Sequence, residues 1–179
     1  QRIGFYADGK LKKASIFGGS PQVVCAVPGY MRGGWWSSDN FIWFGTLSSI
    51  VYRVAADGGT PEEVSVMNSV QGEISHRFPQ LLPDGKTIIF TVKYNNITSF
   101  DDAVIAAENV VTHERKTLIR GGSYARYVPT GHILYARSSS IFAIPFDPVT
   151  NEIKGTPLPV EEGGMLNPLS GDANYSVSA

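Results

Sequence analysis

A strand–turn–strand unit that recurs along the 179-residue chain constrains its fold more than any other feature. It is clearest in residues 75–92, SHRFPQLLPDGKTIIFTV, where two runs suited to β-strands flank a turn at 83–86. Proline fixes φ near the start of such a turn, and Gly85 tolerates the positive φ that other residues resist. A recurring unit of this kind predicts an array of one supersecondary structure.

Weaker copies of the unit precede and follow this stretch. The turn aspartate or its equivalent falls at residues 39, 84 and 130, so the spacings are 45 and 46 residues. The pattern Gly-Gly-(Ser/Thr)-Pro at residues 18–21 returns at 58–61, an offset of 40. Four short strands in a period of this size are typical of a β-propeller blade. A β-sandwich would explain the short strands, but not the recurrence of one turn at a fixed place.

We therefore predict an all-β fold, a β-propeller of four-stranded antiparallel blades with four blade-equivalents in one domain, 1–179. The expected blades are 1–28 with 171–179, 29–67, 73–122 and 123–164. Residues 171–179 look like a first strand without its blade, and closure would remove unpaired edges. Two forms of closure stay open, one within a single chain and one in a homo-oligomer whose chains share a larger ring.

Residues 98–108 allow two interpretations. Ser99 followed by Asp101 and Asp102 would suit the capped start of a helix. The period requires instead a loop and then a strand at 103–108. We expect the strand, because local helix propensity is weak evidence against a repeat.

Charge and hydropathy exclude several classes of partner. The 15 basic and 16 acidic residues give a net charge of −1, without the basic footprint that nucleic acids or anionic membranes require. No run approaches the roughly 20 apolar residues of a membrane span. Cys25 stands alone, so the chain forms no internal disulfide. The chain begins at Gln1, without a methionine or signal peptide, which suggests a fragment of a longer protein.

Signatures of catalysis are also missing from the sequence. His76, His113 and His132 lie in different blades, without the paired spacing of metal ligands. No Gly-x-Ser-x-Gly elbow, P-loop or dinucleotide fingerprint is present. We therefore expect no catalytic residue, metal or cofactor in this chain, and no enzyme activity of its own.

Aligning the turns places several arginine and aromatic residues at equivalent positions near one rim of the central channel. Such a rim suits recognition of peptides, carboxylates or sugars. The predicted ligand-binding residues are Arg32, Trp35, His76, Arg77, Gln80, Tyr124 and Arg126. The alternative is structural: Trp35, Trp36 and Phe78 would be large wedges that pack neighbouring blades, and the arginines would pair with Glu73 or Asp84. For Trp36 we favour a place in the core.

Residues 79–90, PQLLPDGKTIIF, closely match the blade motif of the TolB-like branch of WD-type propellers, which the chain therefore resembles. Residues 37–40 and 128–131 are degraded copies that lack the Pro and the Asp, respectively. More specifically, 7–13, 72–80 and 146–148 resemble the propeller that lies C-terminal to the kinase domain and membrane helix of bacterial serine/threonine protein kinases. Rings of this family usually have six or seven blades, so the resemblance implies that this chain holds part of one.

The resemblance implies a non-catalytic binding or scaffold module, the extracytoplasmic (periplasmic or cell-surface) sensor end of a receptor kinase. Its partner would be a protein, peptide or small molecule at the channel mouth. Two enzymatic readings stay open. A propeller that gates a prolyl-oligopeptidase-type hydrolase would need a serine hydrolase domain elsewhere in the parent protein. A propeller lyase would need a clustered His or metal site.

Overall fold

The computed structural model of the chain describes residues 1–163 and 166–177, which contain four antiparallel sheets. The first sheet has three strands, β1 (Arg2–Ala7), β2 (Lys10–Ser15) and β3 (Gln22–Ala26). The second has four, β4 (Met31–Trp36), β5 (Phe41–Thr46), β6 (Val51–Ala55) and β7 (Glu62–Glu63).

The third and fourth sheets repeat this up-and-down order. The third consists of β8 (Glu73–Leu81), β9 (Thr87–Tyr94), β10 (Val104–Asn109) and β11 (Arg115–Arg120). The fourth contains β12 (Ser123–Val128), β13 (His132–Arg137), β14 (Ser140–Asp147), β15 (Glu152–Ile153) and β16 (Leu158–Glu162), the last two both paired with β14. Two 3₁₀ turns, η1 (Ser69–Gln71) and η2 (Phe100–Asp102), complete the elements.

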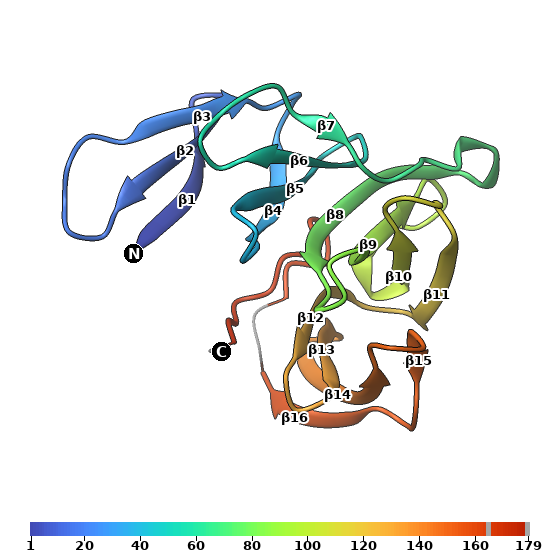
Figure 1. Ribbon diagram of the computed structural model, residues 1–179. Helices are drawn as coiled ribbons and strands as arrows, with labels where there is room; N and C mark the ends of the chain where they lie inside the picture. The colour runs from blue at the N-terminus through green and yellow to red at the C-terminus, as the bar shows by residue number, and fades with distance from the viewer. Residues whose placement is uncertain (164–165, 178–179) are drawn as a thin grey trace.

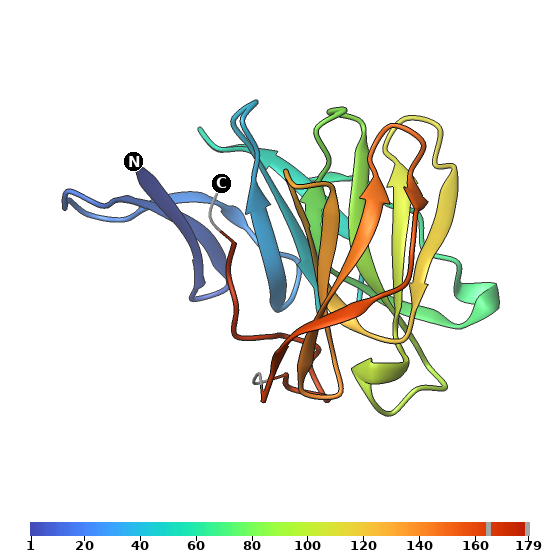
Figure 2. The same cartoon turned by 90° about the horizontal axis from the view of Figure 1, so that it is seen from below.

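The four sheets follow one another round an arc (Figure 1), with β4, β8 and β12 on its inner side. Their long strands run side by side across the arc when it is seen from below (Figure 2). An all-β chain of successive antiparallel sheets whose first strands line a common interior confirms the predicted propeller-type fold. No helix among the described residues is long and apolar enough to span a membrane.

The hydrophobic core is divided between the sheets. One cluster, with Leu11 and Phe44, packs the first sheet on the second. A second cluster, with Trp43 and Phe90, joins the second sheet to the third, and a third, with Ile133, joins the third sheet to the fourth. Trp36, for which we favoured a place in the core, is partly buried and packs against the first of these clusters.

The turn that follows β8 forms as its sequence predicts. Gly85 has φ +70°, and one carboxylate oxygen of Asp84 accepts hydrogen bonds from the N–H groups of Lys86 and Thr87, at 3.0 and 2.9 Å. Asp84 is therefore a turn cap and no partner for an arginine. At residues 98–108 the expected strand forms as β10, and the helix signal at Ser99 yields only η2, whose Asp101 N–H donates to the Ser99 hydroxyl.

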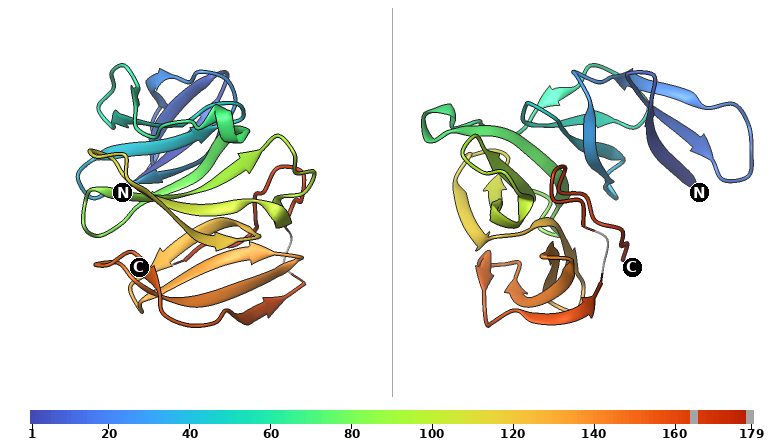
Figure 3. Two further views of the ribbon diagram at one scale, coloured as in Figure 1. Left: turned by 90° about the vertical axis from the view of Figure 1, so that its right-hand side faces the viewer. Right: turned by 180° about the vertical axis from the view of Figure 1, so that it is seen from behind.

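The described residues that follow β16 do not extend any of the four sheets. Within residues 166–177, the tail, Leu166 and Ala173 form an isolated β-bridge. This tail runs along the interior of the arc (Figure 3), where the Tyr175 hydroxyl donates to the carbonyls of Tyr124 and Leu134. The first sheet has three strands, so the predicted pairing of 171–179 with it is absent among the described residues. Residues 164, 178 and 179 of the predicted boundaries lie outside those residues.

Candidate functional site

Each inner strand carries a β-bulge at an equivalent place. The bulge residue has a positive φ in all three, 79° at Gly33, 55° at Phe78 and 58° at Tyr124. A positive φ costs a bulky residue about 1–3 kcal/mol, so the surroundings must impose it. The Phe78 and Tyr124 rings pack at a centroid distance of 4.9 Å. At Gly33 a Cβ atom would come within 2.6 Å of Phe78 Cδ1, which explains the glycine.

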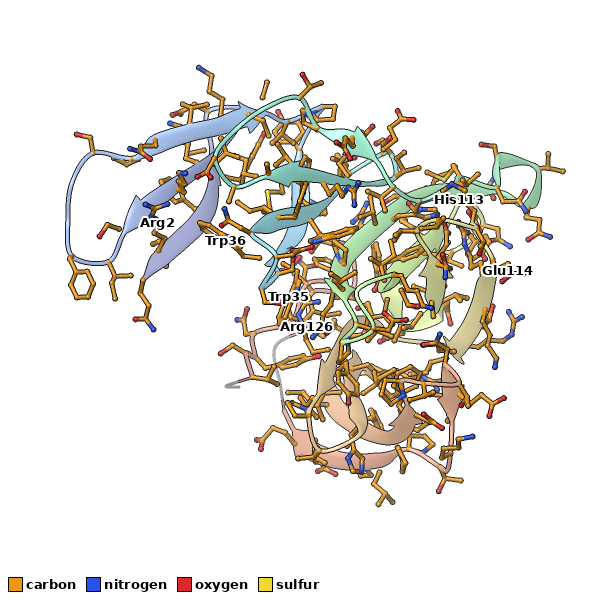
Figure 4. All side chains as sticks on the ribbon, in the orientation of Figure 1. Arg2, Trp35, Trp36, His113, Glu114 and Arg126 are labelled. Atoms are coloured by element: carbon orange, nitrogen blue, oxygen red, sulfur yellow. The ribbon has the colours of Figure 1, made fainter. Side chains whose placement is uncertain are left out.

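The bulges divide the channel-side residues into two layers, each made of equivalent positions. The layer before the bulge contains Arg32, Arg77 and Ser123, and the layer after it contains Trp35, Gln80 and Arg126. Figure 4 shows Trp35 and Arg126 at the interior of the arc, whereas His113 and Glu114 lie at its periphery. Alignment of the turns therefore predicted which positions of the inner strands are equivalent, and the role of these residues in ligand binding stays a prediction.

A groove lies where the inner strands end in their turns. Its volume is about 350 Å³, and Val177 of the tail closes one side. Trp35 and Gln80, two of the predicted site residues, line it together with Tyr127 and the turn residues Ser38 and Asp39. The Gln80 amide nitrogen donates to the Tyr127 carbonyl, and the Gln80 amide oxygen accepts the Tyr127 N–H. Gln80 therefore holds the third and fourth sheets together. Among the described residues, the Trp35 indole N–H has no acceptor, unlike those of Trp36 and Trp43.

Arg77 is buried and does not line this groove. Its Nε donates to the Ser75 hydroxyl at 2.6 Å, and its two terminal nitrogens donate to the carbonyls of Ser170 and Leu47 at 2.9 and 3.0 Å. The guanidinium also lies over the ring of Phe100, 4.7 Å from its centroid. Burial, and then the nearby charge of Arg32, lower the pKa of Arg77 to about 10.

Arg126 and Tyr124 are held in the same interior. Arg126 donates to the carbonyls of Phe78 and Ala125, at 3.0 and 2.9 Å, and its guanidinium lies 4.6 Å from the Tyr124 ring centroid. Tyr124 is half-buried between the rings of Phe78 and Tyr175. Both residues were predicted to bind ligand, and both contact protein here.

His76 is fully buried in a network that reaches beyond its own strand. Its Nδ1 lies 2.7 Å from the Ser65 hydroxyl, and its Nε2 lies 3.1 Å from a Glu73 carboxylate oxygen. Burial lowers the pKa of His76, so the neutral ring accepts from Ser65 and donates to Glu73. The structure therefore places this predicted site residue in the interior, away from the groove.

The order Ser65–His76–Glu73 is that of a nucleophile, a base and an orienting carboxylate. The Ser65 hydroxyl also accepts the Val51 N–H at 2.9 Å, and its residue is only 3% exposed. A substrate atom could not approach it without displacing the core. The arrangement therefore links the segment after β7 to β6 and β8, and Ser65 is not accessible to a substrate in this conformation.

The Glu73 carboxylate of this network also belongs to a buried ion-pair cluster. Arg115 Nη1 lies 2.8 Å from Glu73, and Arg115 Nη2 lies 2.6 Å from Glu108. Burial by itself would raise the pKa of Glu73, but hydrogen bonds from His76, the Asn68 N–H and Arg115 lower it to about 2. Glu108 is 1% exposed and also accepts the Val66 N–H at 3.1 Å.

Reasoning from the sequence missed this cluster. Glu73 and His76 are three residues apart, but Ser65, Glu108 and Arg115 come from other parts of the repeat. The expected alternative, a channel arginine paired with Glu73, is wrong because Arg115 of β11 takes that place. The only signal in the sequence is the acidic Glu108 within an otherwise apolar strand, since a buried carboxylate requires a partner.

Comparison of the sequence with protein-family models and with curated proteins finds no match. Solved structures are similar in fold. A calcium-binding regucalcin from Agrobacterium tumefaciens matches 85% of this chain with 52% of its own, at 12% identity and a TM-score of 0.61. An oligogalacturonate lyase from Vibrio parahaemolyticus matches 92% with 46%, at 13% identity and 0.56. A puromycin-hydrolysing peptidase from Mycobacterium tuberculosis matches 86% with 27%, at 14% identity and 0.57.

These likenesses define the class of protein: the chain has the fold of part of a β-propeller. It spans about half of the regucalcin and the lyase, and about a quarter of the peptidase. At 12–14% identity the comparisons show the fold alone. The TolB-like and kinase resemblances are not shown by them.

One prediction needs correction. We expected the chain not to be an enzyme, but the similar solved structures are mostly enzymes, a lyase and a peptidase among them. The missing motifs that led to this expectation are those of other folds, such as the P-loop and the dinucleotide fingerprint. Propellers build their sites from side chains on separate blades, so short motifs do not reveal them. The comparisons therefore give no support to the expectation that the chain is not an enzyme.

Proposed function

We propose that the chain is the ligand-recognising part of a larger β-propeller, and that the groove beside Trp35 holds the ligand. The observation that carries this proposal is the coincidence of a groove of about 350 Å³ with Trp35 and Tyr127 in its lining. Aromatic faces with free polar edges bind ligands that have one flat apolar face and several hydroxyl or amide groups. A sugar or a short peptide has this chemistry.

The polar groups of the groove support a neutral or cationic ligand there. Asp39 is exposed at one end, with one oxygen accepting the Phe41 N–H at 3.3 Å. Ser38 is exposed beside it. Arg77 and His76 point into the protein and do not reach the groove, so an acidic group would meet only the Asp39 carboxylate at this end.

A binding screen tests the proposal. The wild-type chain and a Trp35→Ala variant would be applied to arrays of oligosaccharides and short peptides, and hits would be confirmed by calorimetry. Because an aromatic anchor carries much of the affinity of such a site, we expect Trp35→Ala to weaken binding at least tenfold. Tyr30→Ala is the matched control, since Tyr30 is 64% exposed and does not line the groove. Equal affinity of wild type and Trp35→Ala would refute the assignment.

A second candidate function is substrate recognition within an enzyme, and the similar solved structures favour it. The lyase among them acts on oligogalacturonate by its name. If this chain belongs to a propeller lyase, incubation with oligogalacturonate should release a product with a new C=C bond, which absorbs in the ultraviolet. The hydrolase reading predicts a serine hydrolase domain elsewhere in the parent protein, which the flanking gene sequence would show.

The cellular context also remains a proposal. Residues 79–90 support a TolB-like propeller, and the receptor-kinase parent and extracytoplasmic location depend on the weaker stretches at 7–13 and 146–148. Completion of the ring by a second copy is supported by the edge of β1, which pairs with no strand other than β2 in the described part of the chain, and by Ile3, which is 54% exposed on that strand. Sedimentation equilibrium tests it: a dimer supports a shared ring, and a monomer at all concentrations refutes it.

A further inference from the structure

We propose that Arg32, Arg77 and Lys93 form an anion-binding site on the channel side of the second and third sheets, and that it takes a ligand bearing carboxylate groups. Arg32 and Arg77 belong to the layer before the bulges, three residues before Trp35 and Gln80 on their strands and thus about 10 Å from these groove residues. Lys93 lies on the neighbouring strand β9. The site is independent of the function proposed for the groove.

The first observation concerns which arginines have carboxylate partners. Arg53 on β6 and Arg115 on β11 form ion pairs with glutamates, whereas the exposed Arg120 and Arg137 form none among the described residues. The arginines of the inner strands are Arg32, Arg77 and Arg126, and within residues 1–163 and 166–177 none of them forms an ion pair. In a chain of net charge −1, this leaves uncompensated positive charge along the channel.

Arg77 forms the buried base of the site, and the half-buried Arg32 and Lys93 are its accessible cations. Arg77 is 2% exposed, and its acceptors, a hydroxyl and two carbonyls, are all neutral. A buried guanidinium ordinarily has a carboxylate partner, because its desolvation is costly. Lys93 lies on β9, which pairs with β8, and is the diagonal neighbour of Arg77. Its ammonium is 5.3 Å from the centroid of the same Phe100 ring.

Arg32 supplies a donor without an acceptor. It occupies the position equivalent to Arg77, 45 residues earlier, on the adjacent inner strand. Its Nε is buried and has no hydrogen-bond partner in the described part of the chain, and its Nη1 makes one long contact, 3.5 Å, to the carbonyl of Met31. The charges of Arg32 and Lys93 thus lie near that of Arg77, and the Arg32 Nε lacks an acceptor among the described residues.

The tail identifies the chemistry of the missing partner. Arg77 and Ser123, equivalent residues of β8 and β12, hold the carbonyls of Ser170 and Gly171, at 2.9 and 2.8 Å. The next residue is Asp172, whose carboxylate accepts the Ser170 hydroxyl and acts favourably on the charge of Arg77. Asp172 forms no ion pair with the three cations and is exposed. The Asp172 carboxylate therefore lies beside the site and partly takes the place of a bound carboxylate ligand.

Calorimetry with citrate tests the site, with neutral trimethyl citrate as the control ligand, in a buffer of low ionic strength that limits screening. Wild type should bind citrate and not its ester. A charged hydrogen bond contributes about 1.5–3 kcal/mol, so Arg32→Gln and Lys93→Gln should each weaken citrate binding at least tenfold. Lys10→Gln, which removes an exposed cation on the first sheet, should leave the affinity unchanged.

Asp172→Asn provides the decisive readout, because a merely structural role would not tighten binding. Removal of the built-in carboxylate should strengthen citrate binding several-fold. Trp35→Ala should not alter citrate binding, so failure of the groove proposal and failure of this one are distinguishable. The inference is overturned if wild type does not bind citrate, if Arg32→Gln binds as well as Lys10→Gln does, or if Asp172→Asn binds no more tightly than wild type.

Discussion

The buried carboxylate of Glu73 should make the stability of the protein strongly pH-dependent. Its pKa is lowered from 4.5 to about 2 in the folded chain. A carboxylate with a depressed folded pKa contributes stability that is present above the unfolded pKa and lost as pH falls towards the folded value. The full contribution is about 3 kcal/mol, of which about 2 kcal/mol should be lost between pH 7 and pH 3.

The substitution Glu73→Gln removes this contribution while keeping the size of the side chain and a carbonyl acceptor. Urea unfolding followed by tryptophan fluorescence at pH 7, 5, 4 and 3 would give the free energy of unfolding of both proteins. The variant should be less stable than wild type at pH 7, and the difference should shrink by about 2 kcal/mol at pH 3. The pKa of His76 is also lowered in the folded chain, so protonation of His76 should destabilise both wild type and variant as the pH falls.

Glu62→Gln serves as the control, because Glu62 forms an exposed pair with Arg53 at 2.8 Å. Its effect should be within about 0.5 kcal/mol at every pH, as is usual for surface pairs. Parallel stability curves for wild type and Glu73→Gln would refute the reasoning, since they would mean that Glu73 titrates alike in the folded and unfolded chain.

Three further results are expected from unfolding experiments at pH 7. Gly33→Ala should destabilise the protein by more than about 2 kcal/mol, because the new Cβ atom would lie 2.6 Å from Phe78 Cδ1. Gly85→Ala is the control: Gly85 has a similar φ but lies in open space, so this substitution should cost about 1 kcal/mol. Ile133→Ala should cost about 2–5 kcal/mol, because the side chain is fully buried between the third and fourth sheets. Tyr175→Phe should lower stability by about 1 kcal/mol through loss of the bonds that its hydroxyl donates to Tyr124 and Leu134; an unchanged midpoint would mean that the tail is not docked in solution.

The repeat period predicted the fold well because each turn is specified locally. Asp84, Gly85 and their equivalents determine where a strand reverses, and the interval between turns then gives the number of strands in each sheet. At residues 98–108 the period also chose the strand correctly over a good helix cap at Ser99. Local capping chemistry produced one 3₁₀ turn, and the pairing of β10 with β9 and β11 determined the rest.

The candidate site was harder to predict because alignment gives the height of a residue along an inner strand and not the direction of its side chain. Trp35 and His76 were both assigned to the rim, yet Trp35 lines the groove and His76 is buried on Phe90. A bulge reverses the alternation of side chains on either side of it. Phe78 gave no warning of its bulge, since a phenylalanine rarely adopts a positive φ.

The bulges and the unpaired arginines occur in the same short stretch of each inner strand, and this coincidence has a physical reason. Backbone strain at Phe78 and Tyr124, and a buried Arg77 without a carboxylate, both lower the stability of the folded chain. Packing between sheets tolerates these costs because the three hydrophobic clusters lie elsewhere, on the faces of the sheets. A sequence selected for stability alone would replace Arg77 with an apolar residue. The proposed anion site would account for the presence of Arg77 beside Arg32 and Lys93.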